Sequence, residues 1–235
     1  FDSKGPLHSG REDIKNNPLD YRKWELCRQT NPGQSRSIDE AMKGADALIS
    51  ASAPGPDTVK RSWVRAMADK AIVFACANPV PEIWPYAAKE EGAFIVATGR
   101  GDFPNQVNNS VCFPGILKGA LLVRARKITD GMAIHCARSI AAFSEKRGLD
   151  PDNIVASMRE TEVFAHEAAD VAVQADKEGV ARTPLLRDEV YRRALADIKA
   201  ARDLVDDMQR EGRIAEPPQA ILEAALVKAI GQVQG

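Results

Sequence analysis

Four amide side chains follow a short apolar run in the stretch Ala97–Asn109: Asn105, Gln106, Asn108 and Asn109. The residues before them, Ala93–Ala97, favour a strand, whereas those from Val107 onward favour a helix. Ligands bind at such strand-to-helix junctions in open sheets. An amide offers both a donor and an acceptor to a ligand that carries carboxylate, hydroxyl and carboxamide groups. We therefore expect a binding site here, although a single Asn is also a common turn and cap residue.

Three further segments place residues of ligand type at the ends of predicted strands. They are Asp2, Ser3 and Lys4; Ser52, Ala53, Pro54 and Gly55; and Asn78. A carboxylate at a strand end commonly accepts hydrogen bonds from the ribose hydroxyls of a dinucleotide, although Asp before Gly is equally typical of a turn. Two prolines after Asn78 fix the backbone that carries it. Four such strand ends in succession predict a nucleotide site at one edge of a sheet.

The apolar pattern predicts an open, doubly wound α/β sheet, mostly parallel and Rossmann-like, followed by an all-helical C-terminal region. The predicted strands are Ala47–Ala51, Ala71–Cys76 and Ala93–Ala97, with the stub of another at Phe1. Ser37 and Glu40 have the spacing of a capping box and predict a helix that ends near Gly44. Further predicted helices are Asp57–Ala68, Ile83–Glu91, Val107–Leu122, Thr129–Lys146, Asn153–Lys177 with a break, Leu186–Gln209 and Pro218–Gln232.

Two domains follow from this pattern: residues 1–125 as a dinucleotide-binding domain and residues 126–235 as a helical region. The sequence contains no GxGxxG turn. If Phe1 and Asp2 end a second strand, the first strand and its Gly-rich turn are expected upstream of the sequence. Apolar residues recur every three to four positions from Val190 to Met208, so that helix can bury a face within the chain or against a partner.

The composition excludes several classes of function. The chain has 235 residues, 44% of them hydrophobic, and a formal net charge of -1, without the basic stretch expected of a nucleic-acid-binding protein. Its apolar runs are shorter than about ten residues, whereas a membrane span needs about 20. The four cysteines are too widely spaced for a zinc or CxxC motif, and Cys76 and Cys112 are expected in the core. We therefore expect a cytoplasmic, reducing compartment.

The strand-end runs together resemble the C-terminal part of a malic enzyme, one of the NAD(P)-dependent, decarboxylating malate dehydrogenases. The matching runs are Asp2-Ser3-Lys4-Gly5 with Gly10-Arg11, Ser52-Ala53-Pro54-Gly55, Phe74 to Ile83, Thr98 to Asn109, and Phe113-Pro114-Gly115-Ile116 through Gly119-Ala120. The resemblance implies oxidative decarboxylation of L-malate to pyruvate and CO2 with reduction of NAD(P)+. It extends from residue 2 to about residue 145, and the helical tail is similar more loosely.

The resemblance also implies roles for individual residues. Asp2, Ser3, Lys4 and the loop Ser52–Gly55 (Ser52, Ala53, Pro54, Gly55) are expected to bind the cofactor. Asn78 is expected between the nicotinamide ribose and malate, and Asn109 on a malate carboxylate with Asn108 beside it. Both NAD and NADP stay open, because Lys4 can meet a 2′-phosphate that Asp2 repels.

In malic enzymes the Tyr and Lys that act as acid and base, and the carboxylates that bind Mg or Mn, belong to the part upstream. We therefore expect no catalytic or metal-binding residue in this chain, and no activity from its 235 residues alone. His135 and His166 are interpreted as structural. Malate and pyruvate are the implied small-molecule partners, with no nucleic acid or membrane, and the family favours a homodimer. Alternatives are another dinucleotide-dependent dehydrogenase of related fold, or a non-catalytic nucleotide-binding module.

Overall fold

The computed structural model describes residues 1–32 and 35–233. Their contacts divide them into two units, one made of Phe1–Pro114 with Ala137–Glu160, and the other of Gly115–Cys136 with the residues from Thr161 onward. We call them the sheet unit and the helical unit. The domain boundary expected after residue 125 stays a prediction, and each unit is described by itself.

Three parallel strands form the sheet: β1 (Ala47–Ser50), β2 (Ile72–Ala75) and β3 (Ile95–Thr98), in the order β1-β2-β3. The expected α/β class is therefore confirmed, with strand ends within two residues of their predicted positions. Parallel pairing aligns Ser50, Ala75 and Thr98 at the last position of the three strands. Because the strands run in the same direction, the loops that follow them leave from one edge of the sheet.

The core of the sheet unit lies around the central strand. Val73 and Ala75 of β2 and Val96 of β3 are buried together with Ile83 and other small apolar side chains. The edge strand β1 alternates exposed and half-buried residues, and its Ile49 is exposed. The predicted covering of both faces of the sheet thus holds for β2 and β3, whereas β1 has one uncovered face within the described residues.

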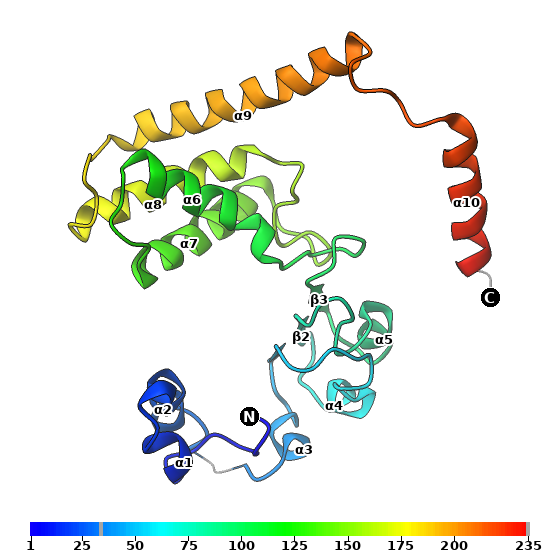
Figure 1. The fold of residues 1–235 in the computed structure, drawn as a ribbon. Coiled ribbons are helices and arrows are strands. Elements are labelled where there is room, and N and C mark those ends of the chain that lie inside the picture. Colours follow the sequence, from blue (N-terminus) through cyan, green and yellow to red (C-terminus); the bar gives the residue numbers. More distant parts are fainter. Residues whose placement is uncertain (33–34, 234–235) are drawn as a thin grey trace. The chain divides into compact units, whose positions relative to one another are not determined.

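Apart from the second part of α7 (Asp130–Arg147), the helices of the sheet unit are short, as Figure 1 shows. They are α1 (Glu12–Lys15), η1 (Pro18–Asp20), α2 (Tyr21–Gln29), α3 (Ile38–Ala41), α4 (Arg61–Arg65), α5 (Pro85–Glu90) and η2 (Asn109–Val111). The cap predicted at Ser37 is confirmed, because Ser37 Oγ accepts the N–H of Glu40 at 3.2 Å. The return bond of a capping box differs, since Glu40 Oε2 accepts the N–H of Arg36, one residue before the cap, at 2.8 Å.

The helical unit contains α6 (Phe113–Leu122), the first part of α7 (Asp130–Arg147), α8 (Glu162–Lys177), α9 (Arg187–Arg210) and α10 (Gln219–Val233). Helix α8 is its centre, with nine buried residues. A Cβ on Gly119 of α6 would lie 2.5 Å from the carbonyl oxygen of Ala168, so the two helix backbones are packed closely. None of the helices among the described residues combines the length and apolarity needed to cross a bilayer.

Several predicted elements were wrong in extent. The stub at Phe1 does not join the sheet, because Asp2 and Gly5 bond to each other in a tight turn. Residues 107–122 form the turn η2 and then α6 rather than one helix, and α8 begins at Glu162, nine residues later than predicted. The helices α1 and α2 lie in a stretch for which no element was predicted. Cys27 and Cys136 are the buried cysteines, whereas Cys76 and Cys112 are half-buried, and none of the four forms a disulfide.

Candidate functional site

The loops after β1 and β2 are joined by one carboxylate, that of Glu82. Its side chain is 0% exposed. Oε1 accepts hydrogen bonds from Ser50 Oγ at 2.8 Å, from the N–H of Ser52 at 2.8 Å and from Ser52 Oγ at 3.2 Å. Oε2 accepts the N–H of Ala77 at 2.9 Å. Oε1 thus accepts hydrogen bonds from the end of β1 and the loop after it, and Oε2 accepts one from the loop after β2.

Glu82 is held in its charged form by these donors. Burial by itself raises the pKa of the Glu82 carboxyl, but the N–H groups of Ser52 and Ala77 and the Ser50 hydroxyl together hold it below its ordinary value. Burial, followed by the charge of Glu82, raises the pKa of the neighbouring Cys76 thiol. A fixed negative charge therefore lies beneath the edge at which the loops end.

Asn78 and Asn108 flank the same glycine at the end of β3. A Cβ built on Gly99 would lie 4.0 Å from Cβ of Asn78, 3.8 Å from Nδ2 of Asn108 and 3.4 Å from the carbonyl oxygen of Cys76. Asn78 is exposed, and its peptide bond to Pro79 is cis. The structure thus brings together two of the three amides expected to bind substrate.

Asn108 is already engaged by the backbone. Its Oδ1 accepts the N–H of Ser110 at 2.9 Å and caps η2, while Nδ2 donates to the carbonyl of Gly99 at 2.9 Å. One N–H of the amide stays available to a ligand. Asn109, the next residue, is exposed at the start of η2.

Asn105 is held through its side chain by three backbone groups and has a structural role. It is buried with a φ of 56°, and Nδ2 donates to the carbonyls of Val96 at 3.0 Å and Pro151 at 2.7 Å. Its Oδ1 accepts the N–H of Ile154 at 2.8 Å. The side chain therefore fastens the loop after β3 to residues 151–154.

The loop Ser52–Gly55 leaves the sheet directly beside Glu82. Ser52, Ala53 and Pro54 are exposed, and Gly55 has a φ of 149°, a conformation that favours glycine. Apart from Ser52, whose N–H and hydroxyl bond Glu82, the loop presents small side chains and backbone to solvent. A flat ligand can approach such a surface closely.

The turn Asp2–Lys4 lies against α1 and α2. Arg11 Nη1 and Nη2 donate to the two oxygens of Asp2, each at 3.1 Å, Lys4 N–H donates to Oδ1 at 3.0 Å, and Lys23 Nζ is 3.5 Å from Oδ2. The Arg11 hydrogen bond is the main cause that lowers the pKa of Asp2 to about 2. Three hydrogen bonds use three of the roughly four acceptor sites of the carboxylate, and the Lys23 ammonium lies near the fourth.

Sequence reasoning missed Glu82 and Arg11. An acidic residue between Pro81 and Ile83, in an otherwise apolar run, was a signal for Glu82, whereas nothing in the sequence pairs Arg11 with Asp2. Within residues 1–32 and 35–233, no three His, Cys, Asp or Glu side chains gather closely enough to hold a metal ion. The described residues by themselves do not fit a metal centre.

Comparisons with known proteins identify the family of the chain. A family profile described as "Malic enzyme, NAD binding domain" matches residues 1–176. The chain is 40% identical over 183 residues to the NAD-dependent malic enzyme of Geobacillus stearothermophilus, a match that covers 77% of this chain and 36% of that protein. It is 38% identical over 199 residues to the NADP-dependent malic enzyme of Halomonas elongata, with 78% of this chain and 45% of that protein covered.

A solved structure is similar over the whole chain. The crystal structure of Entamoeba histolytica malic enzyme matches with a TM-score of 0.95 and 60% identity, and the match covers 100% of this chain and 49% of that one. The chain thus spans half or less of the length of these relatives. Since the family profile covers three quarters of its residues, the chain belongs to the malic enzyme family, and the part that it contains is the NAD-binding domain.

Proposed function

We propose that the full-length protein oxidises L-malate and decarboxylates the product to pyruvate and CO2, with reduction of NAD+ or NADP+. The observation that carries the proposal is the pair Asn78 and Asn108 on either side of Gly99, at the sheet edge where the Ser52–Gly55 loop also begins. The two curated relatives are named as NAD-dependent and NADP-dependent malic enzymes, which supports the same activity here.

In this proposal the cofactor lies against the loop Ser52–Gly55 and the turn Asp2–Lys4. When bound, its nicotinamide supplies the hydride acceptor. A ribose hydroxyl can take the fourth acceptor site of Asp2, the one that Lys23 approaches to 3.5 Å, and the charges of Arg11 and Lys23 reduce the repulsion of Asp2 toward a 2′-phosphate. This geometry is compatible with NAD and with NADP.

Malate is held by Asn78 and Asn109, with Asn108 beside them. Amide N–H groups donate to a carboxylate and bring no full charge into the site. Because Asn108 is fixed by Ser110 and Gly99, its free N–H has a defined direction before the substrate arrives. Preorganised donors of this kind spare the complex the cost of ordering them.

The test is malate-dependent reduction of NAD+ and NADP+ by the purified full-length protein. Asn78→Ala and Asn109→Ala should each raise the KM for malate about tenfold, equivalent to ~1.4 kcal/mol of binding. Asn16→Ala, at an exposed Asn that caps the C-terminus of α1, is the matched control and should leave the KM for malate unchanged. Absence of malate-dependent reduction with both cofactors contradicts the proposal. We also propose that the activity requires Mg2+ or Mn2+, which is tested by removing the metal with EDTA and adding it back. The proposed cytoplasmic location is tested by cell fractionation.

The proposed partner is a second copy of the chain. Val190 and Ala194 of α9 are buried, but the apolar stripe continues to Leu204, which is 60% exposed. Helix α10 is mostly apolar and its apolar residues are not confined to one face, although Gln219, Glu223 and Lys228 are polar. All its residues from 219 to 230 are exposed, with Leu226 at 62% and Val227 at 73%. A helix of this length is marginal in water without a partner, and one that is mostly apolar needs burial.

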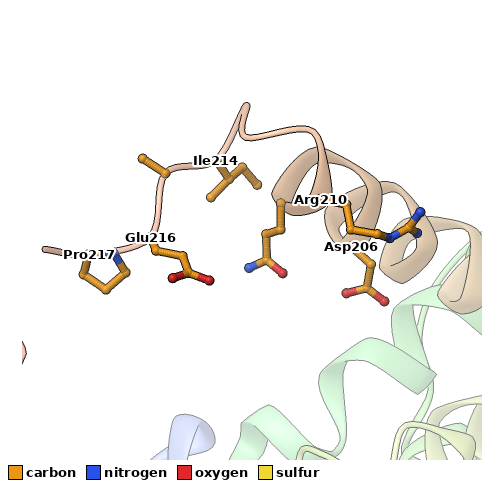
Figure 2. Close-up of a pocket in the computed structure, with 7 residues that line it drawn as sticks. Asp206, Arg210, Ile214, Glu216 and Pro217 are labelled. Carbon is orange, nitrogen blue, oxygen red and sulfur yellow. The ribbon is translucent and has the colours of Figure 1, made fainter. Parts of the chain in front are cut away.

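The segment between α9 and α10 favours exchange between two chains. Pro217 and Pro218 stiffen it. Figure 2 shows the bend, whose hollow of about 640 Å³ is lined by Asp206, Gln209, Arg210, Ile214, Ala215, Glu216 and Pro217. The chain carries two uncovered apolar surfaces on either side of a stiff bend, so reciprocal packing of α10 on α9 of the other copy covers both at once.

Light scattering of the full-length protein tests this homodimer. The wild-type protein and Glu223→Gln, a polar change on α10, should have twice the mass of one chain. Leu226→Asp should shift the equilibrium to the monomer. A monomeric wild-type protein contradicts the proposal.

A further inference from the structure

Glu82 is a buried charge whose partners are neutral. Its donors are two hydroxyls and two backbone N–H groups. A carboxylate taken out of water without a cation is costly, and only a full set of donors offsets that cost. An apolar side chain would fill the same space without this requirement, so the carboxylate calls for an explanation in terms of what it holds.

Glu82 fixes the distance between two loops that the proposed function uses. Oε1 bonds Ser52, the first residue of the cofactor loop, and Oε2 bonds Ala77, the residue before Asn78. The two oxygens belong to one rigid planar group. If one loop moves, the Glu82 carboxylate must move with it or lose a hydrogen bond, and its movement strains the hydrogen bonds to the other loop.

An amide cannot reproduce this contact. Both oxygens of Glu82 act only as acceptors, whereas Gln has one acceptor and one donor group. In Glu82→Gln, the NH2 group must face either the N–H of Ala77 or the donors from Ser50 and Ser52. The hydroxyls of Ser50 and Ser52 can turn to accept from that NH2 group, but a backbone N–H cannot, so either Ala77 or Ser52 loses its N–H bond to residue 82 while the side chain keeps its size.

We propose that Glu82 is a positioning residue that couples the cofactor loop to the Asn78 loop, so that the cofactor and malate bind cooperatively. This inference rests on the proposed function for the identity of the two ligands. Glu82 touches neither ligand in this proposal and acts through Ser52 and Asn78. Each ligand then orders the loop that the other needs.

The test measures two binding events in the full-length protein. For Glu82→Gln we expect the Kd for NAD+, measured by calorimetry without malate, and the KM for malate to rise at least about fivefold, which corresponds to ~1 kcal/mol. The factor by which malate increases the affinity for NAD+ should fall toward one. Glu90→Gln, the same change at an exposed residue of α5, should leave all three values unchanged.

Ser50→Ala tests the attachment of the cofactor loop separately from that of the Asn78 loop. It removes one donor to Oε1 and leaves the Oε2 contact with Ala77 intact. We expect it to raise the Kd for NAD+ and to leave the KM for malate within twofold. Because it keeps the carboxylate, this variant tests the inference even if Glu82→Gln does not fold.

A purely structural role gives a different pattern. It lowers the melting temperature of Glu82→Gln but leaves both affinities and their coupling unchanged below that temperature, and this result would overturn the inference. So would an unchanged Kd for NAD+ in Ser50→Ala. If the wild-type protein does not turn over malate, the proposed function fails, whereas the NAD+ measurements still decide whether Glu82 holds the cofactor loop.

Discussion

Replacement of Glu167 by Gln removes a titrating group from the interior of the helical unit. Glu167 of α8 is 0% exposed. Its Oε2 accepts hydrogen bonds from Cys136 Sγ at 3.5 Å and from the N–H of Gly115. Oε1 has no hydrogen-bond partner among the described residues. Burial raises the pKa of the Glu167 carboxyl to about 8, because two donors are too few to offset the loss of water.

The size of the effect follows from the two pKa values. An unfolded glutamate titrates near 4.5 and the folded one near 8. Between these values the folded protein binds one more proton than the unfolded chain, so the free energy of unfolding falls as pH rises, by about 1.4 kcal/mol per pH unit. This stabilisation is fully present below pH 4.5 and is lost by pH 8. From pH 5 to 7.5 the stabilisation from Glu167 falls by about 3 kcal/mol.

Urea unfolding of the full-length protein at a series of pH values measures this contribution. Gln does not titrate, so the stability of Glu167→Gln relative to wild type should rise by about 3 kcal/mol from pH 5 to 7.5. Near pH 5 the variant should be slightly less stable, because its extra N–H lacks an acceptor. Glu162→Gln, on the exposed face of α8, is the matched control and should give no such slope. A stability difference that does not change with pH refutes the reasoning.

Three further changes test other contacts. Gly115→Ala places a Cβ against the Glu167 side chain, so we expect a loss of about 2 kcal/mol in urea unfolding, and an unchanged value contradicts the packing. Asn105→Ala removes three hydrogen bonds, one buried and two partly buried, and should cost about 2 to 4 kcal/mol by the same assay, whereas a loss below about 1 kcal/mol would mean that the loop has other support. Arg11→Ala removes the main partner of Asp2, whose pKa should rise from about 2 toward its ordinary 3.8 in an NMR titration; a value that stays near 2 would assign the shift to other donors.

The sheet could be predicted from the sequence because its strands are short apolar runs between turn residues. Two such runs, Ala71–Cys76 and Ala93–Ala97, become β2 and β3 almost unchanged. The boundaries of helices were harder to predict where tertiary contacts compete with helix formation. Residues 151–154 are held by Asn105, so α8 begins only at Glu162. No local pattern records a contact between residues almost fifty positions apart.

The amide cluster shows the same limit within the site. Sequence places Asn105, Asn108 and Asn109 in one turn, and only the resemblance singles out Asn108 and Asn109 as substrate-binding residues. The structure gives them different partners: Asn105 is buried and fully bonded, Asn108 is a cap with one N–H left, and Asn109 is exposed. An amide binds whichever backbone groups lie within reach, and that neighbourhood is fixed by the fold rather than by the residue type.

Glu82 and Glu167 show what decides the state of a buried acid in this protein. Both are fully buried, and burial by itself raises the pKa of both. Glu82 ends below its ordinary value because donors from two strand ends meet both of its oxygens, whereas Glu167 ends near 8 because one oxygen has no donor among the described residues. The number of donors therefore sets the sign of the shift. Glu82 keeps its charge because strand ends supply enough N–H and hydroxyl groups at the edge of the sheet unit that carries the proposed site.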